Sequence, residues 1–219
     1  MKKIVIFGNR DFAELAHFYF GYDSSYEVVA FTMDSSYIKE SKFKNLPIVP
    51  FETIENEFSP NEYGLFIPMS FAKMNEYRKE KYYAGKKKGY TLVNYISSKA
   101  TYYNTPVGDN CFIFESNVIQ PFTKIGSNVI LWSGNHIGHH STIEDHVFVS
   151  SHVVVSGHCQ VGEGSFLGVN STISNNVSIA KYNLVGPGAI ITKNTEENSV
   201  YKGSRSEKAP YLSYESKGI

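Results

Sequence analysis

Residues 125–143 read IGSNVILWSGNHIGHHSTI, and within this stretch an aliphatic residue recurs at every sixth position. The spacing extends in both directions, and all fifteen of its positions are Ile, Leu or Val: Val107, Ile113, Ile119, Ile125, Leu131, Ile137, Ile143, Val149, Val155, Val161, Leu167, Ile173, Ile179, Val185 and Ile191. If these types fill roughly a fifth of a typical sequence, chance gives such a run with a probability on the order of 10⁻¹⁰. Neither an α-helix nor a flat strand has a period of six. The chain therefore contains an internal repeat.

A second, smaller inward position accompanies the aliphatic one. The residue four places later is mostly small or β-branched, as in Thr123, Val129, Ser141, Val147, Val153, Cys159, Ser165, Ser171, Val177 and Ala189. A unit with one large and one small inward site forms one side of a triangular prism, so three units complete one coil. Successive coils stack at about 4.8 Å, which makes residues three repeats apart in sequence vertical neighbours.

The first hundred residues show a different pattern. A buried strand at 3–8, an amphipathic helix at 11–20 and a strand at 26–34 form a βαβ opening. Further strands are expected at 46–50, 63–69 and 90–96, with a polar, lysine-rich helix at 71–88. We predict a small Rossmann-like parallel α/β domain at 1–97, the prism at 98–195, and a tail at 196–219 that caps its open end.

The charge balance, the apolar runs and the cysteine content limit the classes of function that the chain can have. Lysine plus arginine and aspartate plus glutamate number 21 each, so no long-range field favours nucleic acid or an anionic membrane. The first apolar run is too short for a signal peptide, and no later stretch approaches a membrane span. The two cysteines, Cys111 and Cys159, are expected to be reduced core residues of a cytoplasmic protein.

The histidines are candidates for a catalytic base. Six of seven lie between residues 136 and 158, and four of them, at the corner positions of the repeat, are expected to be exposed: His140, His146, His152 and His158. His139 lies one place earlier, and the same position in the next three coils is taken by Gly157, Asn175 and Lys193. An imidazole, whose ordinary pKa is about 6.5, can accept a proton from an attacking group. The Gly157 N–H is a candidate donor to the oxyanion of a thioester carbonyl, and Asn175 and Lys193 are candidates to line a groove for the cofactor.

This pattern resembles the hexapeptide-repeat acyltransferases, in particular the sugar-nucleotide acetyltransferases of the sialic acid and bacillosamine type. The resemblance implies a left-handed parallel β-helix, acetyl-CoA as co-substrate and a homotrimer. In 139–145, HHSTIED, it implies that His139 is the catalytic base, with His140 in place of the usual acidic neighbour. It also implies that Gly157, Val169 and Gly188 contact the cofactor through backbone groups. The closing Gly-Asn-Pro-Ala of the family is replaced here by Gly203-Ser204-Arg205-Ser206, which makes Arg205 a candidate partner for a CoA phosphate.

The same resemblance covers the amino-terminal domain. There a glycine-rich turn after the first strand holds the nucleotide of a nucleotide sugar, and here the turn contains Gly8, Asn9 and Arg10. Arg10 is a candidate partner for a diphosphate, and Asp34, which ends the second strand, for a ribose or base. The lysines of 71–88 are interpreted as a solvated helix face.

The sequence thus predicts an N-acetyltransferase of a nucleotide-linked amino deoxysugar, serving bacterial surface glycan or O-antigen biosynthesis. Three alternatives stay open: sugar O-acetylation, a zinc lyase of the carbonic anhydrase type, and a non-catalytic scaffold. No metal is expected, because a period of six places neighbouring histidines on different prism edges, and only His140 and His158 stack directly.

Overall fold

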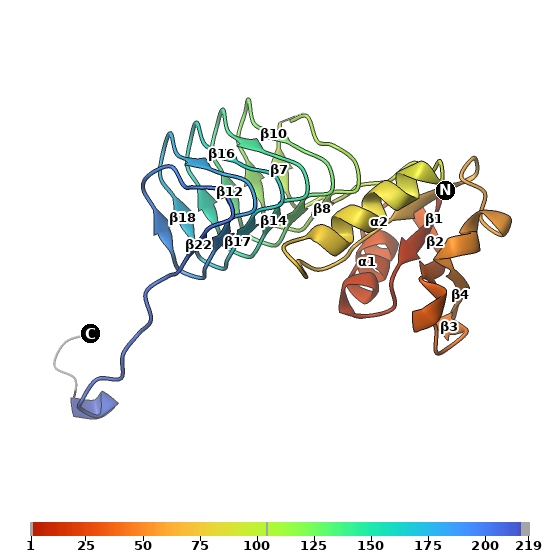
Figure 1. Ribbon diagram of the computed structural model, residues 1–219, viewed down its shortest axis with the longest axis horizontal. Helices are drawn as coiled ribbons and strands as arrows, with labels where there is room; N and C mark the ends of the chain where they lie inside the picture. The colour runs from red at the N-terminus through yellow and green to blue at the C-terminus, as the bar shows by residue number, and fades with distance from the viewer. Residues whose placement is uncertain (1, 104, 216–219) are drawn as a thin grey trace.

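The computed structural model of the protein describes residues 2–103 and 105–215. An α/β unit is followed by a triangular prism of stacked coils, and the last described residues, with a 3₁₀ turn at Ser213–Glu215, run away from the prism as a tail (Figure 1). Residues 216–219 of the predicted capping segment lie outside the described residues. Within the part of the chain that is described, no helix is long and apolar enough to cross a membrane.

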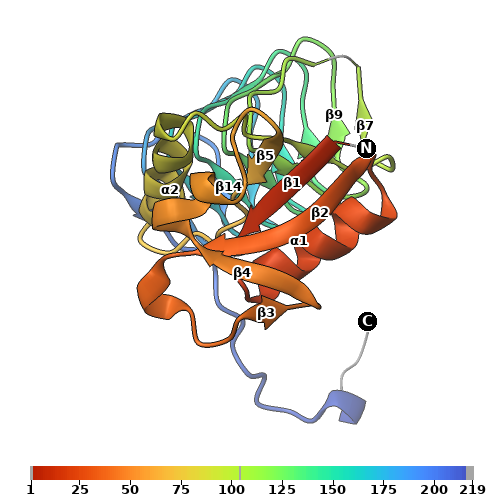
Figure 2. The ribbon, with the colours of Figure 1, turned by 90° about the vertical axis from the view of Figure 1, so that its right-hand side faces the viewer.

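The α/β unit contains a five-stranded sheet in the order β3-β4-β2-β1-β5 (Figure 2). Its elements are β1 (Lys2–Phe7), α1 (Asp11–Tyr22), β2 (Tyr26–Met33), β3 (Lys42–Phe43), β4 (Leu46–Pro50), β5 (Tyr63–Phe66) and α2 (Glu76–Lys87), with 3₁₀ helices at Ser35–Tyr37 and Phe51–Asn56. The sheet is parallel except for β3, which pairs antiparallel with β4. Lys44 and Asn45 join these two strands at φ 48° and 65°, the geometry of a tight two-residue hairpin turn.

Several predicted elements differ in extent, and the strand expected at 63–69 already ends at Phe66. The helix expected at 71–88 begins only at Glu76, because Lys73, Met74 and Asn75 all have positive φ and interrupt the right-handed helix. The strand expected at 90–96 is divided: Leu92 forms an isolated parallel bridge with Leu65 of β5, and β6 (Tyr95–Ile96) pairs with the prism. The division of the chain at 97/98 and 195/196 stays a prediction.

The prism has three parallel sheets as faces (Figure 1). The first face contains β6, β8 (Phe112–Ile113), β11 (Ile130–Leu131), β14 (Phe148–Val149), β17 (Phe166–Leu167), β20 (Leu184–Val185) and β22 (Val200–Tyr201). The second face contains β7 (Thr101–Tyr102), β9 (Val118–Ile119), β12 (His136–Ile137), β15 (Val154–Val155), β18 (Thr172–Ile173) and β21 (Ile190–Ile191). The third face contains β10 (Lys124–Ile125), β13 (Thr142–Ile143), β16 (Gln160–Val161) and β19 (Ser178–Ile179).

The coils stack in the predicted register. Ile125 pairs with Ile143, Leu131 with Val149 and Ile137 with Val155, so that each partner lies three repeats further along the chain. The aliphatic and small positions together form a buried core inside the prism, and Cys111 and Cys159 are free, buried thiols within it. The six-residue spacing therefore predicted the coil correctly, since each repeat buries the same two positions.

The α/β unit docks on the first face. Residues alternate along β1, so that Ile4 and Ile6 face α1, while Val5 and Phe7 lie in the cluster that contains Tyr82 of α2. On its other side α1 meets the prism: the Phe12 ring lies 5.7 Å from Trp132 and the Tyr19 ring 5.1 Å from Phe114, both edge-on. The outward aromatic residues of the first face are therefore buried beneath a helix.

Arg78 of α2 forms a second set of contacts between the α/β unit and the prism. Its side chain is fully buried; Nη2 donates to the His146 carbonyl oxygen at 2.8 Å, and Nη1 donates to Asn75 Oδ1 at 2.9 Å. Asn75 in turn donates to the Gly164 carbonyl oxygen at 2.8 Å. Burial lowers the pKa of Arg78 to about 9, so the guanidinium is charged at neutral pH and depends on these oxygens for solvation.

His146 departs from the predicted exposure of the corner histidines. It is fully buried, because α2 covers the edge between the third and first faces. The Asn128 amide is 2.8 Å from His146 Nδ1, which makes this nitrogen an acceptor, and Nε2 lies 3.3 Å from the Tyr83 hydroxyl. Burial lowers the pKa of His146 from 6.5 to about 4.

This pKa predicts an acid sensitivity. As pH falls below about 6.5 the unfolded chain takes up a proton at His146 that the folded chain refuses until about pH 4, so the free energy of unfolding should decrease across this window. His146→Asn should remove this pH dependence of the unfolding free energy, because asparagine does not titrate. Asparagine also fits the site, since Asn128 and Asn110 occupy the same column. Urea unfolding between pH 7 and 4 measures it, with His152→Asn as the exposed control. Equal pH dependence in parent and H146N would contradict the assignment.

Candidate active site

His139 lies on the prism edge between the second and third faces, just after β12. Its N–H donates to Gln120 Oε1 at 2.9 Å, and its carbonyl oxygen accepts the His158 N–H at 2.9 Å. The backbone of this edge is therefore held to the coils before and after it. We call the edge formed by residues 138–141, 156–159 and 174–177 the His139 edge; its side chains at 139, 140 and 158 are exposed.

The His139 ring rests on Gly157 of the next coil. A Cβ built on Gly157 would lie 2.8 Å from His139 Cε1 and 2.9 Å from Nε2, so only glycine leaves room for the imidazole there. The Gly157 N–H, however, donates to Asn175 Oδ1 at 2.9 Å. The structure thus brings His139, Gly157 and Asn175 together in the expected column. The Gly157 N–H, which was predicted to donate to the oxyanion, already donates to Asn175.

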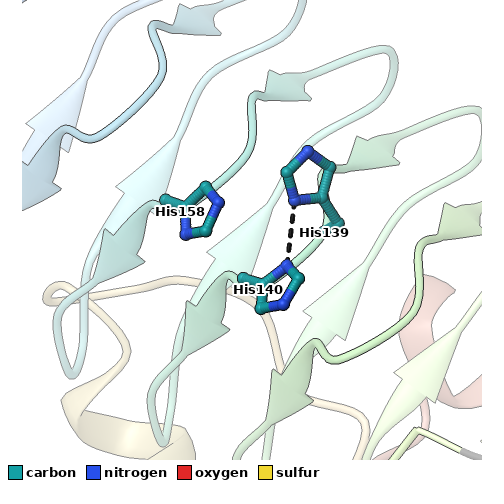
Figure 3. Close-up of side chains that lie close together, drawn as sticks. All are labelled: His139, His140 and His158. Carbon is teal, nitrogen blue, oxygen red and sulfur yellow. Dashed lines mark hydrogen bonds between the residues drawn. The ribbon is translucent and has the colours of Figure 1, made fainter.

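His140 contacts His139 directly. The two Nδ1 atoms are 3.0 Å apart, so one ring donates and the other accepts (Figure 3). The His140 ring also stacks on His158, with centroids 4.8 Å apart and planes 12° from parallel, and lies 4.7 Å from the Phe122 ring. A neutral His140 that accepts from His139 Nδ1 would leave the lone pair of His139 on Nε2.

The remaining predicted cofactor residues fall on two different edges and in the tail. Lys193 follows β21 as Asn175 follows β18, and both side chains are exposed on the His139 side. Val169 and Gly188 are exposed on the edge between the first and second faces. Arg205 is exposed in the tail. One chain therefore does not gather all six predicted contacts at a single edge.

The predicted nucleotide residues do lie together. Gly8, Asn9, Arg10 and Asp34 line one cavity of roughly 1130 Å³ at the carboxyl ends of β1 and β2. Gly8 has φ 103°, a conformation that favours glycine and that turns the chain from β1 toward α1. Ligands of parallel α/β sheets bind at this position, outside the carboxyl ends of the strands.

Lys81 was misassigned to a solvated helix face. It lines the same cavity, its side chain is only 18% exposed, and its Nζ lies 2.8 Å from Asp34 Oδ1. Three cationic side chains thus line the cavity: Arg10, Lys39 and Lys81. Tyr77, four residues before Lys81 on α2, also lines it, and this i, i+4 spacing is the sequence signal that would have placed both on one face.

The cavity and the His139 edge are separate within one chain. All residues that line the cavity belong to the α/β unit, which docks on the first face. The His139 edge joins the second and third faces, so it is the corner of the triangle opposite the first face. The cavity and the His139 edge therefore lie on different sides of one chain.

The fold has counterparts among known proteins. Residues 122–157 match the family model described as bacterial transferase hexapeptide (six repeats). No curated protein sequence matches the chain. The chain is similar in structure to the acetyltransferase domain of PglB from Neisseria gonorrhoeae FA1090, with a TM-score of 0.82 and 18% identity over 93% of this chain and 97% of that one. The same domain in complex with acetyl coenzyme A gives a TM-score of 0.81 and 16% identity, covering 92% and 96%.

PerB from Caulobacter crescentus, in complex with CoA and GDP-perosamine, is also similar. Its TM-score is 0.80 and its identity 19%, over 92% of this chain and 94% of that one. Likenesses at such identities establish the fold. The predicted fold class is confirmed: an α/β domain with a small sheet, here mixed at its edge, precedes a left-handed parallel β-helix of hexapeptide repeats.

We predict that Gly157→Ala moves the His139 ring without unfolding the prism. The three atoms nearest to the added methyl group belong to the imidazole, which can rotate, so the ring should leave its place and lose the contact with His140. A crystal structure of the variant measures the ring position, and its melting temperature should stay within a few degrees of the parent. Gly21→Ala, whose methyl group meets nothing within 4 Å, is the control. An unmoved imidazole would contradict the packing described.

Proposed function

We propose that the protein is an acetyl-CoA-dependent N-acetyltransferase that acts on a nucleotide-linked amino deoxysugar, with His139 as the general base. The observation that carries this proposal is the packing of the His139 imidazole on Gly157, with Nδ1 at 3.0 Å from His140 Nδ1. It holds a candidate base on an exposed edge, over a glycine whose missing side chain makes room for the imidazole. The fold shared with an acetyltransferase domain that binds acetyl coenzyme A supports the same interpretation.

In the proposed reaction the sugar amine attacks the thioester carbonyl carbon. A C–N bond forms while His139 Nε2 takes a proton from the amine, and collapse of the tetrahedral intermediate breaks the C–S bond to release CoA. His140 acts as a positioning residue: by accepting the His139 Nδ1–H it keeps the Nε2 lone pair available and stabilises the imidazolium that forms. It would thus replace the carboxylate expected next to the base.

Oxyanion stabilisation is assigned to Asn175 together with Gly157. Because Asn175 Oδ1 accepts the Gly157 N–H, the Nδ2 group of the same carboxamide is the donor that remains to be aimed at the developing oxyanion. In this proposal Gly157 leaves room for the His139 ring and orients Asn175, instead of donating its own N–H to the oxyanion.

The acetyl-CoA would lie along the His139 edge. Gly157 and Asn175 belong to this edge and Lys193 continues it one coil further, while Val169 and Gly188 would meet the cofactor from the adjacent edge of a second chain. Arg205 remains a proposed partner of a CoA phosphate. The reaction needs no metal, because a thioester is already activated and its leaving thiol is stable.

The amino sugar nucleotide is assigned to the cavity at β1 and β2. Arg10 and Lys81 are placed to pair with a diphosphate, Asp34 is placed to accept hydroxyl or base N–H groups, and Gly8 and Asn9 offer backbone at close range. The volume of roughly 1130 Å³ accommodates a ligand of this size. PerB, which shares the fold, is in complex with GDP-perosamine.

A homotrimer would unite the two half-sites. Among the described residues, the outward side chains of the second face include the exposed Val118, Val154 and Ile190 and no lysine, arginine or acid, whereas the third face presents Lys124, Gln160 and Ser178. Apolar exposed surface of this kind is typical of subunit contacts. If the second face turns toward a threefold axis, the His139 edge of one chain adjoins the first–second edge of the next, beside its α/β unit.

The cellular setting belongs to the same proposal. Nucleotide sugars and acetyl-CoA are cytoplasmic metabolites, so we place the enzyme in the cytoplasm, in bacterial surface glycan or O-antigen biosynthesis. It would act without nucleic acid and without insertion into a membrane.

The activity is tested with acetyl-CoA and a panel of nucleotide-linked amino sugars, with thiol release as the readout. Parent protein should release CoA with at least one amine, and His139→Asn should lower kcat by roughly 10²–10⁴-fold, the contribution of a general base. Lys124→Gln, whose exposed side chain lies on the third face away from the proposed subunit contact, should leave kcat unchanged. Thiol release with hydroxyl acceptors but with no amine would show that the enzyme is an O-acetyltransferase. Thiol release with none of the acceptors, or full activity of H139N, would refute the proposal.

The split site predicts complementation between inactive variants. His139→Asn lacks the base, and Arg10→Glu reverses a charge in the nucleotide cavity, so each trimer alone should be inactive. Co-expressed chains that mix at random should regain roughly a quarter of the parent activity, because mixed trimers contain one interface with both intact halves. No recovery in mixed trimers that have been isolated by two affinity tags would show that each chain contains a whole site.

A further inference from the structure

Three imidazoles converge on the His139 edge. His139, His140 and His158 each offer a ring nitrogen, and these nitrogens all lie within 4.8 Å of one another (Figure 3). The sequence-based expectation of no metal relied on neighbouring histidines falling on different edges. That holds for His146 and His152, but His139 and His140 are consecutive and His158 stands directly above His140.

The spacing of these rings is set by the backbone. His140 and His158 both have φ 58° and lie one coil apart, so their side chains leave the edge in the same direction. The His158 N–H donates to the His139 carbonyl oxygen at 2.9 Å, which fixes the register of the two coils at this corner. His139 meets His158 edge-on, with ring centroids 5.0 Å apart.

This arrangement is close to that of a three-histidine metal site. Zinc binds imidazole nitrogens at about 2.0–2.1 Å in a tetrahedron, so its ligand atoms stand roughly 3.3 Å apart. The His139 and His140 Nδ1 atoms are already 3.0 Å apart, and the exposed rings can rotate to bring in the third. A set made only of imidazoles favours Zn²⁺, Ni²⁺ or Cu²⁺ over Mg²⁺ and Ca²⁺, and leaves one coordination position open.

We propose that His139, His140 and His158 bind one Zn²⁺ ion and that this ion inhibits acetyl transfer. The inhibition rests on the proposed function, whereas the binding does not. If zinc binds His139 Nδ1, the neutral ring carries its proton on Nε2, so Nε2 has no free lone pair. If zinc binds Nε2, the metal occupies the lone pair of that nitrogen. In either case His139 no longer accepts a proton from the amine, and chelation of the ion restores it.

Zinc binding is measured first, without reference to activity. Untagged protein freed of metal with EDTA and dialysed is titrated with zinc sulfate by calorimetry, and Co²⁺ serves as a spectroscopic probe of tetrahedral coordination. The parent should bind one Zn²⁺ per chain. His158→Asn should weaken binding by at least the 10–100-fold that loss of even an outer-shell partner costs. Asparagine fits this position, because Asn176 occupies the same column one coil later at φ 61°.

His152→Asn is the matched control, since His152 has the same repeat position and φ 58° but lies apart from the three rings. Its affinity for Zn²⁺ should equal that of the parent. In the transferase assay zinc should inhibit the parent and EDTA should reverse the inhibition. H158N, compared with its own rate in the absence of zinc, should need a higher zinc concentration for the same fractional inhibition.

The metal site would be refuted if the parent did not bind one Zn²⁺ per chain in the titration, or if H158N and H152N bound Zn²⁺ with equal affinity. Stoichiometric zinc with undiminished acetyl transfer would overturn the inhibition. A parent that binds zinc but transfers no acetyl group to any acceptor would refute the proposed function and leave the metal site standing.

Discussion

The constraint on which the structure depends is the stacking of a six-residue repeat into coils of three repeats each. Because each inward aliphatic side chain lies on its counterpart in the preceding coil, the register of every outward residue is fixed as well. The prism core thus decides that His139 lies over Gly157 and that His158 lies over His140. A shift of one residue in any coil would bury polar side chains and disperse the His139 edge.

The second determinant of function is where the α/β unit docks. Aromatic side chains on α1 and the first face, together with Arg78, fix this unit on the side of the prism opposite His139. The proposed nucleotide cavity and the proposed base therefore lie on different sides of one chain, and the apolar second face would bring them together between chains. Assembly would then be part of the catalytic mechanism.

The repeat made the prism, its register and the His139–Gly157 contact predictable, since all three follow from a spacing that can be counted. Features that depend on contacts between the two parts of the chain were not predictable in this way. His146 was expected in solvent but lies beneath α2, and Lys81 was expected in solvent but faces Asp34. The Gly157 amide was expected to be available, but Asn175, one coil away, accepts its hydrogen bond.

The most direct measurement is a crystal structure of the protein with CoA and a nucleotide-linked amino sugar bound. We expect the CoA sulfur and the sugar amine to meet beside His139 Nε2 of one chain, while the nucleotide occupies the cavity of Arg10 and Lys81 in its neighbour. Both ligands held within a single chain, or a CoA sulfur remote from His139, would contradict this mechanism.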